Sequence, residues 1–139
     1  MPELDYVILA DYVRQDAGTI HLMAAGLDTF YIPASALPAM VPVGIAIRIM
    51  LSSQDAAGEV HKLSLVFSGP DGELLNLTQH FPAPEPPEGI PPTWRHSVTV
   101  AMRLGIPFPA HGVYALQVML DDDPVRSRRL DYRAVEPAG

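Results

Sequence analysis

The sequence contains no cysteine, and this absence removes several classes of site at once. Disulfide frameworks, thiolate zinc sites, iron–sulfur clusters and cysteine nucleophiles all require the thiol. Positive charge is also scarce, because 9 Lys and Arg stand against 16 Asp and Glu, a formal net charge of −7. Nucleic acids and anionic membranes are bound mainly through clustered Lys and Arg, so we expect neither as a partner.

Long hydrophobic runs are missing as well. The sequence begins Met1-Pro2-Glu3-Leu4-Asp5 without a basic region, and Asp11 interrupts the apolar run that follows, which does not fit a secretory signal. No unbroken apolar stretch approaches the roughly 20 residues of a membrane-spanning helix. We therefore expect a cytoplasmic protein, and a length of 139 residues fits one domain over residues 1–139.

Proline is what the sequence has in quantity, with 15 residues, about twice the usual share of ~5%. Proline cannot donate to a β-ladder, so strands are expected in the proline-poor stretches, where apolar and polar residues alternate. Eight strands are predicted, over residues 4–14, 19–27, 44–52, 62–68, 75–81, 96–103, 114–120 and 130–134. No segment has sustained helical spacing, and residues 34–40 form one helical turn at most.

Two turns predict hairpins. Gln15-Asp16-Ala17-Gly18 separates the first two strands, and Gly69-Pro70-Asp71-Gly72 separates the fourth and fifth. Residues 82–93 hold six prolines and almost no periodicity. This stretch is predicted to be a long surface connection that crosses between two sheets.

Eight strands with one apolar face each must bury those faces against one another, which predicts an antiparallel β-sandwich. The segment from Gly112 to Val118, with Tyr114, Leu116 and Val118 alternating, resembles the penultimate strand of many bacterial immunoglobulin-like modules. In those modules the tyrosine packs at the end of the sandwich and its hydroxyl reaches the backbone. An immunoglobulin-like arrangement is therefore favoured, with C2-like and jelly-roll sandwiches as the alternatives.

At the scale of the whole chain, the sequence resembles a bacterial, mainly actinobacterial, family of small all-β proteins of unknown function. The resemblance rests on these motifs: Leu4-Asp5-Tyr6, Ala10-Asp11-Tyr12, residues 18–26 with His21, Gly69-Pro70-Asp71-Gly72, Trp94-Arg95 and Asp121-Asp122-Asp123. It implies a small all-β protein, and it implies no activity, cofactor or catalytic residue.

Motifs that carry chemistry are mostly absent. The sequence has no Gly-x-Ser-x-Gly elbow, no phosphate-binding glycine loop and no His-Glu-x-x-His. Its five histidines are far apart and never form a His-x-His pair, so we interpret them as surface or cross-strand hydrogen-bonding residues and expect no cofactor. Strand pairing remains able to bring His80 and His96 together across the proline-rich stretch.

A carboxylate cluster and one aromatic residue keep a ligand site open as an alternative. Asp121, Asp122 and Asp123 offer the oxygen ligands that calcium prefers, although three arginines follow closely and Asp is common in tight turns. The single tryptophan, Trp94, suits either sugar stacking or packing at the sandwich end. A ligand site of this kind is expected in the loops near Trp94, His96, His111 and Asp121.

The first two strands are apolar on both faces, although an antiparallel sheet normally leaves one face polar. Such a hairpin must be covered twice, by the core and by either residues 28–42 or another chain. If another chain covers it, the interface would be formed by Val7, Leu9, Met23 and Ala25.

Two classes of function follow from these observations. The leading hypothesis is a non-enzymatic binding or assembly module that pairs with itself, as a homodimer, or docks on a larger complex through the apolar hairpin face or an open sheet edge. The alternative is a ligand-handling sandwich, either an enzyme or a binder of sugar, calcium or another small molecule.

Overall fold

The protein is built from β-strands, as predicted. A computed structural model of the chain describes residues 1–16, 19–91 and 93–138. In these ranges it contains one short 3₁₀ turn, Ala34–Ala36, and ten strands: β1 (Glu3–Ala10), β2 (Tyr12–Asp16), β3 (Thr19–Met23), β4 (Thr29–Tyr31), β5 (Ala39–Leu51), β6 (Val60–Gly69), β7 (Gly72–Pro82), β8 (His96–Phe108), β9 (Gly112–Leu120) and β10 (Asp123–Val135).

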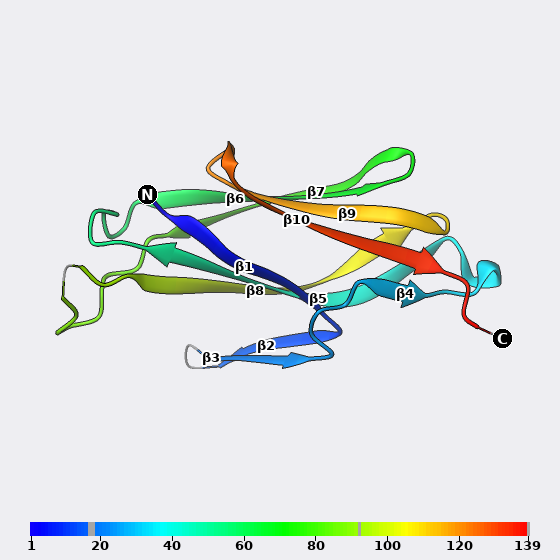
Figure 1. Cartoon of the computed structure of the whole chain (residues 1–139), viewed down its shortest axis with the longest axis horizontal. Helices are drawn as coiled ribbons and strands as arrows, with labels where there is room; N and C mark the ends of the chain where they lie inside the picture. Colours follow the sequence, from blue (N-terminus) through cyan, green and yellow to red (C-terminus); the bar gives the residue numbers. More distant parts are fainter. Residues whose placement is uncertain (17–18, 92, 139) are drawn as a thin grey trace.

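The strands form two facing sheets and a separate hairpin (Figure 1). One sheet has the order β1-β5-β8, and the other has the order β4-β10-β9-β6-β7. The β2–β3 hairpin forms a third layer on the outer side of the three-stranded sheet. All neighbouring strands are antiparallel except β4 and β10, which pair in parallel through three residues of each strand.

The first predicted strand is two strands, which is one reason for ten strands instead of eight. After β1 the chain bends at Asp11, and β2 leaves the sheet to pair with β3. A bulge between Leu4 and Tyr6 also breaks the strict alternation of faces, so that Leu4, Val7 and Leu9 all point into the core. The turn residues Ala17 and Gly18 of the predicted hairpin lie outside the described residues.

The second additional strand is β4, which lies in a stretch predicted to be a loop. Its three residues line the edge of β10, where Phe30 enters the core and Ile32 follows it inward. Residues 28–42 therefore complete the five-stranded sheet and begin β5, so the alternative in which they cover the outer face of the first hairpin is not the arrangement found.

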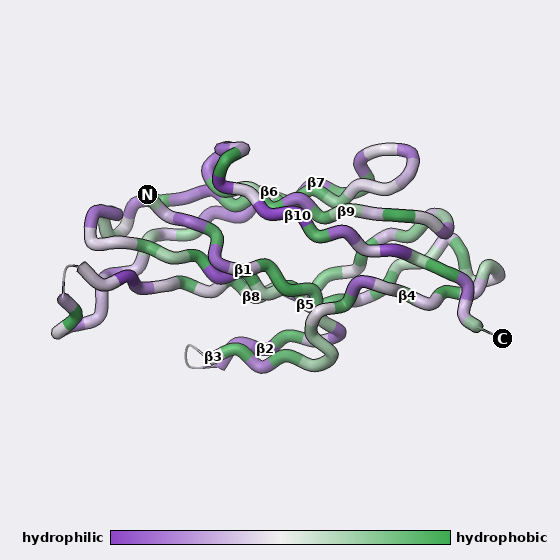
Figure 2. The backbone as a smooth tube through the Cα atoms, viewed as in Figure 1, coloured by the Kyte–Doolittle hydropathy of each residue, from purple (hydrophilic) through white to green (hydrophobic). Residues whose placement is uncertain are grey.

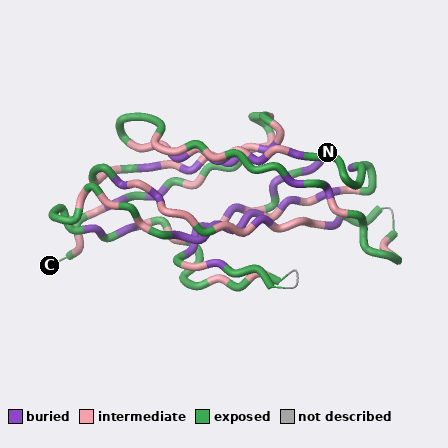
Figure 3. The backbone as a smooth tube through the Cα atoms, turned by 180° about the vertical axis from the view of Figure 1, so that it is seen from behind, coloured by how far each residue is buried: buried purple, intermediate pink, exposed green. Residues whose placement is uncertain are grey.

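The β2–β3 hairpin itself covers the outer face of the three-stranded sheet. Val13 and Leu22 lie opposite each other on the inward side of the hairpin, and Val13 packs directly on Gly44. A methyl group at Gly44 would lie 2.6 Å from the Val13 nitrogen, so the approach requires glycine. In Figure 3 most of the hairpin is exposed or intermediate, whereas the sheet above it is largely buried.

The core lies between the two sheets. Its apolar side chains alternate along each strand, and Figure 2 shows hydrophobic and hydrophilic residues succeeding one another along β10. Four aromatic rings fill one end, with centroid separations of 5.0 to 5.8 Å: Phe30, Phe108, Tyr114 and Tyr132. The Tyr114 hydroxyl donates to the Ala110 carbonyl and accepts from the Ala110 N–H at 3.3 Å.

The predicted connections agree with the structure. Gly69 and Gly72 pair across the Pro70-Asp71 turn of the β6–β7 hairpin. The proline-rich stretch links β7 in one sheet to β8 in the other, as expected, with Pro92 outside the described residues. None of the described residues belongs to a helix long and apolar enough to cross a membrane.

Candidate functional site

The acidic turn joins β9 to β10 in a tight two-residue loop. Leu120 pairs with Asp123, and both intervening residues have positive φ, 51° at Asp121 and 56° at Asp122. Two successive residues with positive φ are the requirement of a type I′ hairpin turn, and Asp tolerates this conformation better than most residues. The turn therefore has a conformational reason for its aspartates.

Each carboxylate of this turn is paired with groups of the chain itself. Asp121 accepts from His61 Nδ1 and from the Lys62 backbone N–H, both at 2.8 Å. Asp122 lies 3.0 Å from the Lys62 ammonium, and Asp123 accepts from Arg126 Nε at 3.1 Å. Among the described residues, no group of three or more His, Asp or Glu side chains is arranged to hold a metal ion.

The environment of the turn lowers the pKa of two of its carboxyls. Burial alone would raise the pKa of Asp121, but the Lys62 N–H, His61 and Arg126 together hold it below its ordinary value. The Val125 N–H and the Arg126 guanidinium lower the pKa of Asp123. Both side chains are therefore anchored as carboxylates by donors that a bound cation would have to displace.

His61 is the buried member of this cluster. Its alternation with Leu63, Leu65 and Phe67 places it on the core side of β6, and only 6% of its side chain is exposed. Nε2 of the ring has no hydrogen-bond partner among the described residues. His61, Asp121 and Arg126 line a pocket of about 320 Å³, which also includes Asp55 and the N-terminal residue.

The structure separates the predicted ligand residues. Trp94 is exposed just before β8, and His96 is buried at its first residue. His111 follows the other end of the same strand, where its Nε2 lies 2.6 Å from the Ile32 carbonyl. Since β8 has 13 residues at about 3.3 Å each, His96 and His111 lie at opposite ends of a strand about 40 Å long. His80 is exposed on β7 and does not join His96.

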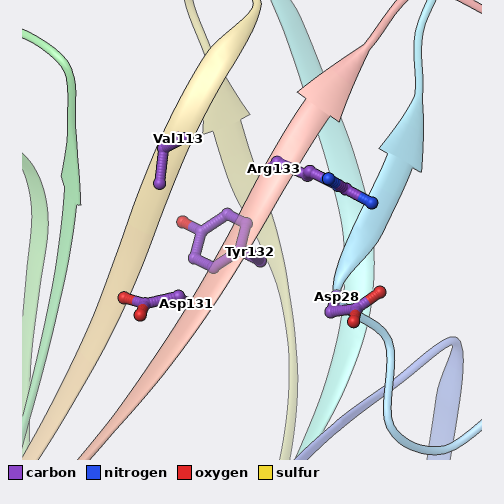
Figure 4. A pocket seen from close by; sticks show the side chains of 5 residues that line it. All are labelled: Asp28, Val113, Asp131, Tyr132 and Arg133. Carbon is purple, nitrogen blue, oxygen red and sulfur yellow. The ribbon is translucent and has the colours of Figure 1, made fainter.

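A shallow pocket of about 140 Å³ lies over β9, β10 and the start of β4 (Figure 4). Its charged groups are already paired, because Arg133 Nε donates to Thr29 and Arg129 binds Asp131 at 2.8 Å. The Tyr132 hydroxyl has no partner among the described residues, and burial together with Tyr114 raises its pKa. At this volume the pocket is well below the roughly 300 Å³ of a typical ligand site.

The four residues predicted as an interface fall into two groups. Val7 and Leu9 are buried in the core, because the bulge in β1 turns them inward. Met23 and Ala25 are exposed at and beyond the end of β3. The chain itself therefore covers Val7 and Leu9, and only Met23 and Ala25 are accessible to a partner.

The open edge of the three-stranded sheet lies along β8, which pairs only with β5. In an antiparallel pair, residues alternate between those that bond to the partner and those whose N–H and C=O point away. Pro42 and Pro107 have no N–H, so the pairs Pro42–Gly105 and Met40–Pro107 are not hydrogen-bonded pairs. Every second residue of β8 has the same orientation as Gly105 and Pro107 and points its backbone N–H and C=O away from β5. Before Pro107 these outward residues are Ser97, Thr99, Ala101, Arg103 and Gly105.

The β8 edge is nearly free of other contacts. Gln15 donates its side-chain amide to the Thr99 carbonyl at 3.4 Å, and no other hydrogen bond to these outward backbone groups occurs within the described part of the chain. A groove of about 220 Å³ between β8 and the hairpin is lined by Val13, Arg14, Gln15, Ala101, Met102 and Arg103.

The opposite edge of the same sheet is closed. Arg126 donates to the Pro2 carbonyl at 3.2 Å, and Arg128 donates to the Leu4 carbonyl at 3.0 Å. These β10 side chains occupy acceptors on the outer edge of β1, and β1 contacts β10 along this side. The sandwich is therefore sealed between β1 and β10, whereas β8 remains open.

The sequence did not identify the residues that line these edges. Arg126 and Arg128 were noted only as arginines that neutralise the acidic turn, and nothing in the spacing of Gln15 and Arg103 marks the edge they line. Pro42 and Pro107 carried a usable signal, because a proline within a strand implies that its N–H side is unpaired.

Residues 5–132 match the sequence model of a family described as "Family of unknown function (DUF6941)". No curated protein matches the chain.

Proposed function

The chain belongs to this family of unknown function, and from this starting point we propose that it is a non-enzymatic assembly module that binds another polypeptide at the β8 edge. The bound segment adds a strand to the three-stranded sheet. The free outward groups of β8 are the single observation that carries the proposal.

The contrast between the edges supports this proposal. Proteins normally protect a sheet edge with charged residues, proline, short strands or a covering element. β4 has only three residues, arginine side chains occupy the edge of β1, and the edge strand β7 carries Glu73 and ends in Pro82. β8 has 13 residues, no Lys, Asp or Glu, and no proline before Pro107. A long and weakly protected edge of this kind is what strand-addition partners use.

We also propose that the sandwich is immunoglobulin-like. The strand orders β1-β5-β8 and β4-β10-β9-β6-β7, with β4 parallel to β10, support this arrangement. The Tyr114 hydroxyl at the start of the penultimate strand bonds to the backbone of Ala110, as the tyrosine corner of such folds does. The β2–β3 hairpin would then be an addition to the common framework.

The test is affinity capture from cells of the source organism with three immobilised forms of the protein. Ala101→Pro removes one outward N–H and leaves the bonds to β5 in place, so we expect it to lose the captured partner. Thr78→Pro is the matched control. Thr78 lies four residues before Pro82 on β7, so the backbone groups of the two residues point in the same direction. Pro82 has no N–H to bond to β6, so the N–H of Thr78 also points away from β6.

The outcome is defined by the two variants together. The proposal predicts a partner that is retained by the wild type and by Thr78→Pro and is lost by a folded Ala101→Pro. Capture that is equal for all three forms would overturn it, because binding would then not use β8.

A ligand-handling role is the second candidate, and the pocket beside His61 favours it. A histidine held by Asp121 at 2.8 Å lines a space of about 320 Å³, which lies at the lower end of the range for ligand sites. A ligand that binds the native state selectively raises the melting temperature. Melting with Ca²⁺, Zn²⁺ and a panel of sugars tests this candidate, and unchanged midpoints at millimolar concentrations would count against it.

A further inference from the structure

We infer that the segment that occupies the β8 edge is β8 of a second copy of this chain, paired antiparallel about a two-fold axis at Ala101. This inference rests on the proposed function and names its partner. The result is one continuous sheet with the order β1-β5-β8-β8-β5-β1 across the two copies. Closed two-fold pairing uses the same edge on both copies and leaves neither β8 exposed.

The pattern of outward groups selects this register. The five outward residues of β8 before Pro107 are centred on Ala101. About that centre Ala101 faces Ala101 of the copy, Thr99 faces Arg103, and Ser97 faces Gly105. All five residues then exchange hydrogen bonds, and Pro107 falls opposite Arg95, which lies outside the strand. A centre at Arg103 would instead place Pro107, which has no N–H, opposite Thr99.

Charge supports the same register. Two chains with a net charge of −7 repel one another, so contact is least unfavourable at β8, which carries no carboxylate. The register centred at Ala101 keeps Arg103 opposite Thr99, whereas a centre at Arg103 would oppose two arginines directly.

The core-facing side of β8 is apolar and incompletely covered. Val98, Met102 and Leu104 are only partly buried, whereas the β5 residues opposite them are almost fully buried. In the pairing about Ala101, Val98 faces Leu104 of the copy and Val100 faces Met102. Apolar side chains meet apolar side chains on this side of the sheet, and their burial favours association.

The absence of cysteine allows a direct test of the register. Directly opposed residues that exchange hydrogen bonds have Cα atoms about 5.5 Å apart, which a disulfide can span. We expect Ala101→Cys to form a disulfide-linked dimer rapidly in mild oxidant. Thr99→Cys is the matched control on the same strand and face. Its sulfur would lie about 13 Å, four residues along the strand, from its counterpart, so it should cross-link slowly.

Light scattering after gel filtration provides the second readout. The wild type and Thr78→Pro should run at twice the chain mass of 15.1 kDa, and Ala101→Pro should run as a folded monomer with an unchanged circular dichroism spectrum. If Ala101→Pro does not fold, the comparison of the two cysteine variants decides.

The outcomes separate this inference from the proposed function. A wild type that remains monomeric at high concentration, with equal cross-linking of the two cysteine variants, overturns pairing with a second copy. If such a monomer still captures another protein through β8, the proposed function stands and only the identity of its partner changes.

Discussion

At the scale of single residues, Asp121 connects more of the structure than any other side chain of its turn. Its carboxylate holds the His61 ring and the Lys62 backbone, and it lies 3.6 Å from Arg126. These contacts tie the β9–β10 turn to the neighbouring strand β6. The polar groups it satisfies lie at the edge of the core, where an unsatisfied partner is costly.

Asp121→Asn should therefore destabilise the protein by about 1–3 kcal/mol at pH 7, because the amide keeps the turn conformation but loses the charge facing His61 and Arg126. Urea denaturation measures this difference. Asp122→Asn is the control, since Asp122 is exposed and pairs only with Lys62 at the surface, and it should cost less than about 1 kcal/mol. Equal losses in the two variants would contradict the central role of Asp121.

The pH dependence of this difference has a definite sign. The folded-state pKa of Asp121 is below the unfolded value near 3.8, so its contribution is complete above that value and is lost as the pH falls below it. The gap in unfolding free energy between the wild type and Asp121→Asn should therefore be constant from pH 7 to 5 and should shrink below pH 4. A gap that grows on acidification would contradict the lowered pKa.

Tyr114 is the second residue with a defined task. Its hydroxyl exchanges hydrogen bonds with both backbone groups of Ala110, while its ring stacks on Tyr132. Tyr114→Phe keeps the ring and removes the hydroxyl, so we expect a loss of about 1 kcal/mol in urea denaturation. Tyr31→Phe is the control on an exposed ring and should have no measurable effect.

At the scale of elements, the β2–β3 hairpin depends on close backbone approach. A Cβ atom at Gly44 would lie within 3.0 Å of Val13 and Tyr12, and two of its three nearest neighbours are backbone atoms. Gly44→Ala should force the hairpin away from the sheet and destabilise the protein by about 1–3 kcal/mol.

Gly105→Ala is the matched control for this prediction. Its added methyl would meet only the flexible side chain of Met40, which is exposed and can move. A thermal melt of both variants should show a clear loss for Gly44→Ala and a small change for Gly105→Ala. The reverse order would mean that the hairpin does not rest on Gly44.

The elements also show what the sequence can predict. Period-two alternation located most strands of the two sheets, because alternation reflects burial on one face, and the turn residues Gly69-Pro70-Asp71-Gly72 located the β6–β7 hairpin. It missed the bend at Asp11 and the bulge before Tyr6, since a bulge shifts the pattern by one residue without a distinctive residue type. It also missed β4, whose three residues are held by β10 about a hundred residues later in the chain.

The candidate edge was predicted less well than the strands. An open sheet edge was anticipated, but not which edge, because pairing between β1, β5 and β8 is set by tertiary contacts that local periodicity does not contain. The predicted ligand residues failed to assemble for the same reason. Trp94, His96 and His111 are close in sequence, but a long strand carries His111 to the other end of the molecule.

At the scale of the whole molecule, the sandwich is asymmetric. One side is sealed where β1 meets β10, and the other side leaves β8 unpaired. In the proposed dimer the open β8 edge of each copy is covered by the other copy, and the sealed side of the sandwich stays at the surface.

The position of β5 at the centre of these layers has a consequence for the exchange of amide protons with solvent. β5 is paired with β1 along one edge and with β8 along the other. Its segment from Val43 to Ile47 is buried, with the core on one face and the β2–β3 hairpin on the other. Its amides have no local route to water. Deuterium should therefore enter β5 last, at a rate set by global unfolding. Amide exchange in this strand then measures the free energy of unfolding of the whole protein.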